Sequence, residues 1–230
     1  YLGKTNQTAL PEQLTLQLRR HQALRYGENP HQHAAWYVPL SGPVSGLASL
    51  RQLQGKELSY NNLLDIDAAV RCLLDVEQPT CVIIKHTSPC GIASAPSIAE
   101  ACQRAYACDS ESAFGGIVGF NRPLDRQAAS QLVETFLEVI VAPVIEPQVA
   151  AIFAKKPNVR LIELAMPSAS SVPEWHSVMG GWLVQEQDVA ARERSAPRVV
   201  TKRHPTQEEA RDLRFAWIAV AGARNSWLAS

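Results

Sequence analysis

The sequence predicts a layered α/β fold. Between about residues 61 and 164, short apolar runs rich in β-branched residues alternate with amphipathic segments that begin at helix-capping residues. This alternation is typical of domains in which helices pack on a sheet. The chain has 230 residues, of which 46% are hydrophobic and 19% charged. It is therefore long enough to bury a substantial core, either as one large domain or as two small ones.

The first half of the alternating region contains two predicted helices and one predicted strand. A helix is expected over residues 61–77, because apolar residues recur there at helical spacing after two asparagines. The continuous run Cys-Val-Ile-Ile at 81–84 predicts a strand that is buried on both faces. Ser97 and Glu100 form a capping box, which predicts a helix that runs to about Cys108.

The alternation continues to residue 164. We expect, in order, a strand at 116–120, a helix from Asp125 to about Phe136, a strand at 139–141, a helix at Pro147 and a strand at 159–164. Asp125 is a typical N-cap residue. Pro147 suits the first position of a helix, where the backbone N–H that proline lacks has no partner within the helix.

Both ends of the chain show a weaker pattern. A Pro- and Ser-rich interruption occupies residues 166–176 and is followed by a predicted strand at 178–185. A second capping box, Thr206 with Glu209, predicts a helix through Trp217. We divide the chain into an entering linker or edge segment at 1–23, a first subdomain at 24–165, and a connecting segment with the incomplete start of a second subdomain at 166–230.

Composition excludes several classes of partner. The chain carries 22 basic and 22 acidic residues, so it has no overall field that would attract a nucleic acid or an anionic membrane. The apolar stretch 215–223 is far shorter than the roughly 18 residues that span a bilayer. No secretory signal pattern is visible at the start of the sequence. We expect a cytoplasmic protein that binds a small molecule or another protein.

The densest cluster of reactive side chains is Lys85-His86, which follows the buried strand at 81–84. In open α/β sheets, ligands bind at the carboxyl ends of strands. The neighbouring cation favours the neutral imidazole, so His86 could act as a general base. The alternative is a solvated lysine beside a histidine that is hydrogen-bonded in a turn.

Other candidates are less specific. Arg25 and Tyr26 could hold a phosphate, although an arginine before a Gly/Asn/Pro turn is also common surface structure. Cys90 lacks the second cysteine of the zinc pattern P-C-x-x-C, so we expect no zinc and interpret it as a structural thiol. A weaker hypothesis makes Cys90 a nucleophile that acts with His86. The two glycines in 112–116 indicate either close approach to a ligand or a bulge.

Six blocks of the sequence, taken together, resemble the bifunctional purine-biosynthesis family AICAR transformylase/IMP cyclohydrolase, specifically its transformylase domain. The blocks keep the family's order and spacing over about residues 20–217, and they are 24–32, 55–65, 82–91, 112–116, 138–143 and 198–202. The resemblance implies a cytidine-deaminase-like fold, with three α/β/α layers around a mixed sheet and without the zinc.

The resemblance also implies a reaction. A formyl group would pass from 10-formyltetrahydrofolate to the 5-amino group of AICAR, giving FAICAR, which the full-length parent also cyclises to IMP. Carried over to this sequence, the family's roles make His86 the proton-transfer residue and Lys85 its supporting cation. The implied nucleotide contacts are Arg25 and Tyr26 near the phosphate, Asn62 and Gly116 along the pocket, and Glu138. A potassium site in some members matches Val200 and Thr201.

Some features depart from the family. Thr87 stands where the family commonly has asparagine, and residues 218–230 scramble its lysine-rich continuation. Compared with the family, the second transformylase subdomain and the cyclohydrolase domain are expected to be absent from this chain. Family members are homodimers that share active sites, so self-association is expected. The alternative function is a non-catalytic nucleotide-binding or dimerisation fragment.

Overall fold

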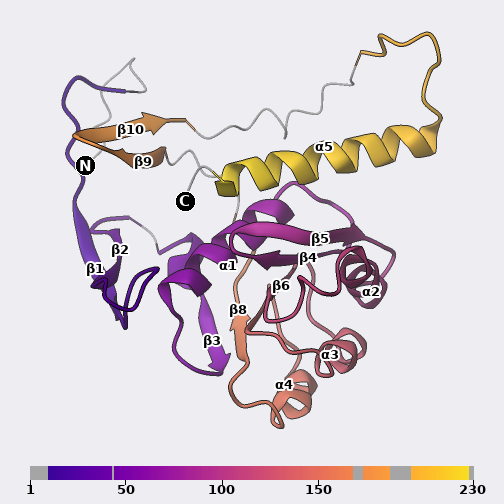
Figure 1. The fold of residues 1–230 in the computed structure, drawn as a ribbon, viewed down its shortest axis with the longest axis horizontal. Helices are drawn as coiled ribbons and strands as arrows, with labels where there is room; N and C mark the ends of the chain where they lie inside the picture. The colour runs from indigo at the N-terminus through magenta and orange to yellow at the C-terminus, as the bar shows by residue number, and fades with distance from the viewer. Residues whose placement is uncertain (1–9, 43, 168–172, 187–197, 228–230) are drawn as a thin grey trace.

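The computed structural model describes residues 10–42, 44–167, 173–186 and 198–227, and its centre is a six-stranded mixed sheet (Figure 1). In spatial order the strands are β3 (Arg51–Gln54), β8 (Arg160–Glu163), β7 (Val139–Ala142), β6 (Ile117–Phe120), β4 (Thr80–Lys85) and β5 (Ser88–Ser94). Strands β6, β7 and β8 run parallel, whereas β3, β4 and β5 pair antiparallel with their neighbours. The carboxyl ends of β3 and β4 therefore lie at the same end of the sheet as the amino ends of β6, β7 and β8.

Helices cover both faces of this sheet and complete three layers. Helix α1 (Tyr60–Leu73) packs on one face through the core cluster that contains Ile66, Ile84 and Val141. The opposite face packs against three helices, which are α2 (Ile98–Cys108), α3 (Arg126–Leu132) and α4 (Pro147–Phe153). This arrangement confirms the predicted three-layer α/β/α class with a mixed sheet.

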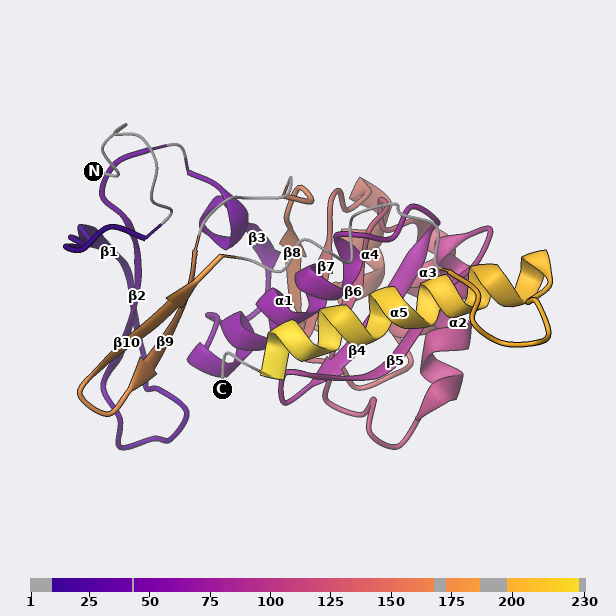
Figure 2. The same cartoon turned by 90° about the horizontal axis from the view of Figure 1, so that it is seen from above.

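Of the strands in the described part of the chain, four lie outside the main sheet, in two hairpins at the same end of the molecule (Figures 1 and 2). Strand β1 (Leu18–Leu24) pairs with β2 (Ala34–Pro39), and β9 (Glu174–Val178) pairs with β10 (Gly181–Gln185). A short 3₁₀ helix, η1 (Gly46–Ser49), precedes β3. Helix α5 (Gln207–Trp227) contacts α1 and β5. Within the described ranges, no helix is long and apolar enough to cross a membrane.

Four of the five predicted helix starts agree with the structure, whereas α1 is capped by Ser59 and not by the asparagines at 61 and 62. Asp125 caps α3 by accepting the N–H of Ala128 at 2.8 Å, and Pro147 is the first residue of α4. The Thr206 box is complete, because Thr206 and Glu209 each accept the other's backbone N–H. Helix α2 spans 98–108 as predicted. Capping depends on contacts three residues apart, which explains why these starts are visible in the sequence.

Several predicted boundaries are wrong. The strand expected at 178–185 is the hairpin β9–β10, which turns at Gly180 with φ +85° and begins inside the expected interruption 166–176. The helix expected to reach about Phe136 ends at Leu132, and α5 continues ten residues past Trp217. The helix expected over 61–77 is α1, which runs from Tyr60 to Leu73. Strand β5 is not among the predicted elements.

Candidate active site

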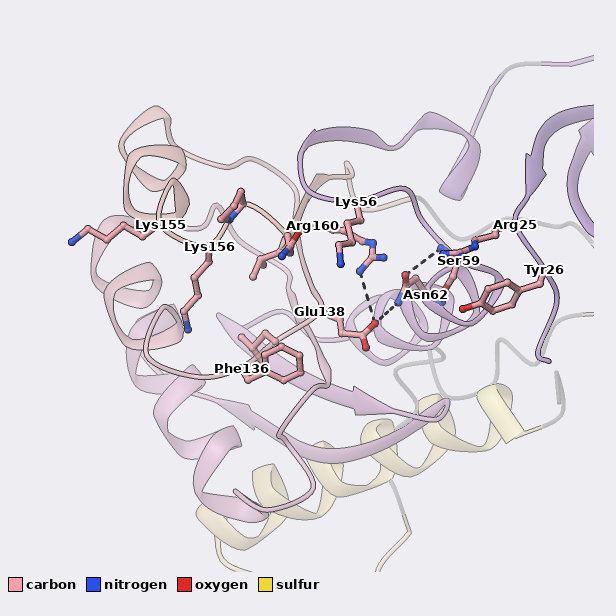
Figure 3. Close-up of a pocket in the computed structure, with 14 residues that line it drawn as sticks. Arg25, Tyr26, Lys56, Ser59, Asn62, Phe136, Glu138, Lys155, Lys156 and Arg160 are labelled. Atoms are coloured by element: carbon pink, nitrogen blue, oxygen red, sulfur yellow. Dashed lines mark hydrogen bonds and ion pairs between the residues drawn. The ribbon is translucent and has the colours of Figure 1, made fainter. Parts of the chain in front are cut away.

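A cavity of about 650 Å³ opens at the end of the sheet where β3 ends and β8 begins (Figure 3). Four of the residues predicted to bind nucleotide line it together: Arg25, Tyr26, Asn62 and Glu138. Its other lining residues are Lys56, Ser59, Phe136, Leu137, Lys155, Lys156, Pro157, Asn158, Val159 and Arg160. The cavity therefore joins segments that are more than a hundred residues apart in the sequence.

The direction of each strand decides which loops lie at this end of the sheet. Lys56 follows the carboxyl end of β3, whereas Glu138 and Arg160 stand at the amino ends of β7 and β8. Lys85 and His86 do stand at the carboxyl end of β4, as expected, but the cavity lies at the amino ends of the parallel strands β7 and β8. That rule applies to doubly wound sheets, whose topology differs from the mixed order seen here.

The cavity is electropositive although the chain has no net charge. Of the described residues that line it, five are cationic, and Glu138 is the single carboxylate. The side chain of Arg160 is only 13% exposed. Burial lowers the pKa of Arg160, and the charge of Glu138 opposes that effect. A concave surface with this balance of charge attracts an anion.

Glu138 is held from both sides (Figure 3). The side-chain amide of Asn62 donates to its Oε2 at 3.0 Å, and Nη1 of Arg160 lies 3.9 Å from the same oxygen. Asn62 is itself buried and fixed, because it forms a reciprocal capping box with Ser59 at the start of α1. The carboxylate is therefore oriented before any ligand arrives.

The basic loop after α4, at residues 154–159, is hydrogen-bonded to Gln54, the last residue of β3. The side-chain amide of Gln54 lies within hydrogen-bonding distance of the carbonyls of Phe153, Lys156 and Val159, at 3.2, 3.1 and 3.3 Å. Gly55 follows with φ +105° and passes directly against the backbone of Arg160. These contacts place the lysines of the loop along the cavity wall.

Lys85 and His86 are not among the described residues that line this cavity, but the loop that Lys85 contacts reaches it, because the ring of Phe114 lies 4.9 Å from that of the lining residue Phe136. His86 and Thr87 form the two-residue turn between β4 and β5, and His86 is exposed. The ammonium of Lys85 donates to the carbonyl of Phe114 at 2.7 Å, in the loop that leads to β6. The turn is thus connected to the glycine pair at 115–116.

Asp65 joins the turn to α1, and it is not among the predicted site residues. Its Oδ1 accepts the N–H of Thr87 at 2.6 Å. Burial raises the pKa of Asp65, while the hydrogen bond from Thr87 and the charge of His86 lower it and Glu138 raises it further. Asp65 is therefore close enough to sense both His86 and the carboxylate of the cavity.

The remaining predicted site residues fall into three environments. Gly116 is buried, its carbonyl accepts the N–H of Glu138 at 3.1 Å, and a Cβ there would lie 3.0 Å from the carbonyl of Ile84. Cys90 is half-buried, and burial raises the pKa of its thiol, which disfavours a thiolate nucleophile. Val200 and Thr201 are exposed and do not line the cavity.

The potassium position that the family resemblance implies at Val200 and Thr201 stays a prediction. The Thr201 hydroxyl donates to the carbonyl of Arg203 at 2.7 Å, within the same loop. Over the described ranges, no group of three or more His, Cys, Asp or Glu side chains is placed to hold a metal ion.

Several residues that line the cavity were not predicted from the sequence, although two of them lie in a family block. Lys56 and Ser59 belong to the block 55–65, from which only Asn62 was selected. Lys155 and Lys156 form a basic pair before a proline, which is an ordinary pattern for a surface loop. Arg160 begins a buried strand, so only the pairing of β8 with β3 and β7 reveals its place.

Comparison with known proteins agrees with the geometry. The sequence matches the family described as the AICARFT/IMPCHase bienzyme over residues 1–226. Two solved structures of Acinetobacter baumannii RibD, forms 1 and 2, match at 16% and 15% identity with TM-scores of 0.32. Each match covers 45% of this chain and 33% of the RibD chain, a similarity that carries no argument about function. Because the family match spans nearly every residue, the chain belongs to the AICAR transformylase/IMP cyclohydrolase bienzyme family of purine biosynthesis.

Proposed function

We propose that this chain takes part in formyl transfer from 10-formyltetrahydrofolate to the 5-amino group of AICAR. One observation carries the proposal: Arg25, Tyr26, Asn62 and Glu138, which come from three separate sequence blocks, converge on one electropositive cavity beside the Lys85-His86 turn. A ribotide has an anionic phosphate, ribose hydroxyls and a heterocycle. The cavity offers a matching partner for the first two groups.

In this proposal the cations bind the phosphate and Glu138 binds the ribose. Arg25 and Arg160 can each bind a phosphate through two parallel hydrogen bonds, and the lysines add positive charge. Glu138 already accepts from Asn62, and it retains free lone pairs for ribose hydroxyls. The ribotide would thus be oriented by contacts far from its reacting amine, which is what alignment of two large substrates requires.

The transfer itself needs a base to accept the amine proton and a positive charge near the oxyanion. The AICAR amine forms a C–N bond to the formyl carbon, and the bond from that carbon to N10 of the folate then breaks. The amine loses a proton to His86, and the imidazolium formed then gives that proton to N10 as the folate leaves, so His86 returns to its neutral form. Lys85, held by the carbonyl of Phe114, supplies positive charge near the oxyanion of the tetrahedral intermediate.

Formyl transfer by the chain and by its His86→Ala variant tests this proposal. We expect the substitution to reduce kcat by about a hundred-fold or more, which is the usual contribution of a general base. Calorimetric binding of the ribotide should stay within about two-fold, because His86 does not line the cavity. His204→Ala, in an exposed loop, is the matched control. Full turnover in His86→Ala would refute the assigned role.

A second candidate function is nucleotide binding without transfer, in a fragment that also dimerises. The position of His86 beside the cavity, rather than within its lining, favours this candidate. Exposed apolar residues on α5, among them Leu213 and Trp217, offer a surface for self-association. Ribotide binding that is lost in Arg160→Gln, with no formyl transfer by the unmodified chain, would support this function over the first. Sedimentation velocity measures the dimer.

A further inference from the structure

The turn that carries His86 has an unfavourable backbone. Lys85 pairs with Ser88 at the end of the β4–β5 hairpin, so His86 and Thr87 alone make the turn. Their φ angles are +54° and +60°. Turns of this hand prefer glycine, asparagine or aspartate, and a β-branched residue such as threonine is a genuine outlier there. Such a conformation persists only when contacts from the surrounding structure hold it.

Asp65 supplies that contact from a different layer of the fold. Its Oδ1 accepts the N–H of Thr87 at 2.6 Å, across 22 residues of sequence. Thr87 also donates its hydroxyl to the carbonyl of His86 at 2.7 Å, but this bond lies within the turn and cannot anchor it. Backbone hydrogen bonds from both Thr87 and His86 oppose the rise that burial causes in the pKa of Asp65. The carboxylate is therefore directed at the backbone of the turn.

The same helix orients the cavity and the turn. Asn62 and Asp65 are three residues apart on α1, so they project from neighbouring positions on one side of the helix. Asn62 holds Glu138, and Asp65 holds Thr87. A buried helix is rigid, so α1 sets the position of the His86 turn relative to the cavity.

The geometry points to Asp65 as a positioning residue for His86, because its carboxylate fixes the turn that aims the imidazole at the bound nucleotide. For the reaction itself this inference rests on the proposed function. The contact between Asp65 and the turn stands independently of it.

Four variants test the inference by steady-state kinetics. Asp65→Ala should lower kcat by about ten-fold or more, which corresponds to a lost hydrogen bond to a charged group. Its KM for the ribotide should change by less than about two-fold, because Asp65 does not line the cavity. Asp65→Asn keeps an acceptor oxygen and should lose about three-fold or less. Adding Thr87→Gly to Asp65→Ala should restore most of kcat, since glycine adopts positive φ freely.

Asp67→Ala is the matched control. Asp67 lies two residues further along α1, is half-exposed and pairs with Arg71 at 2.6 Å. An equal loss of kcat in the Asp65 and Asp67 variants would overturn the positioning role, because it would indicate a general weakening of α1. Unchanged kcat in Asp65→Ala, or no recovery on adding Thr87→Gly, would overturn it as well.

The amide resonance of Thr87 provides a readout that needs no turnover. An N–H that donates to a carboxylate is deshielded, so the Thr87 amide proton should move upfield in Asp65→Ala and stay in place in Asp67→Ala. If it moves as expected while no formyl transfer is detected even with the unmodified protein, the proposed function fails and the contact of Asp65 with the turn stands. If it does not move, the inference fails whatever the activity.

Discussion

Replacing Gly55 with alanine should separate β3 from β8 and distort the wall of the nucleotide cavity. Gly55 has φ +105°, and a Cβ built on it would lie 2.5 Å from Cα of Arg160 and 2.6 Å from the carbonyl oxygen of Val159. Both are backbone atoms, so no change of side-chain rotamer relieves the overlap. The strands themselves must move apart.

Gly42 provides a control with almost the same backbone conformation. Its φ is +104°, and nothing lies within 4 Å of the Cβ that alanine would add. Gly42→Ala therefore carries only the cost of the positive φ, about 1–2 kcal/mol. Gly55→Ala carries that cost and the overlap, for which overpacking typically adds about 1–3 kcal/mol. We expect a total loss of about 2–5 kcal/mol for Gly55→Ala.

Urea unfolding followed by tryptophan fluorescence measures the difference. Both variants should keep the m-value of the unmodified chain, and the midpoint should fall further for Gly55→Ala. Calorimetry should show weaker ribotide binding for Gly55→Ala alone, because Arg160 lines the cavity. If the two free energies of unfolding agree within about 0.5 kcal/mol, which is the usual limit of additivity, the steric argument is refuted.

Three further predictions concern buried polar groups and thiols. Asp65→Asn should raise the free energy of unfolding at neutral pH, because burial raises the pKa of this carboxyl and the folded state bears the cost of ionising it. The gain should vanish below the ordinary aspartate pKa, where the carboxyl is neutral in both states, and a gain that persists in acid would contradict this. A thiol reagent should label exposed Cys108 first, whereas Cys72 and Cys81 should react only on unfolding, since burial raises the pKa of Cys72 to about 12 and that of Cys81 well above its usual value. Asn121→Ala should lower the free energy of unfolding by about 3 kcal/mol, because the Asn121 side chain accepts the N–H of Thr80 and donates to the carbonyls of Val76 and Gln78. Thermal unfolding measures the loss. A loss no greater than that of Asn61→Ala, at an exposed position, would argue against this.

Elements with local causes were predictable. The buried strand β4 is a continuous apolar run, and α2 and α3 start at side chains that cap their own first turns. Strand β5 has no comparable signal, because it contains Pro89 and Gly91 and has no alternating apolar pattern. It forms because β4 offers an edge to pair with and because Gly91 lets α2 approach. A Cβ at Gly91 would lie 2.0 Å from the carbonyl oxygen of Ala105.

The candidate site likewise contains some residues that were predictable from the sequence and others that were not. Its polar blocks were visible in the sequence, and four of the five residues predicted to bind nucleotide line one cavity. Arg160 and Asp65 were missed, because the partner of each is distant in sequence; Asp65 ends the block 55–65, from which only Asn62 was selected, and Arg160 lies outside the six blocks. Cys90 attracted attention through its neighbours, yet burial makes its thiol less reactive.

By itself, the sequence determined the layered α/β class, the helix starts and the blocks that match the family, because each depends on residues close together in the chain. The tertiary structure alone decided that β6, β7 and β8 run opposite to β4, and it thereby decided which loops meet at the cavity. It also decided that Asp65 meets the turn of His86. Strand direction and contacts between layers arise from packing over long sequence separations, which no local pattern encodes.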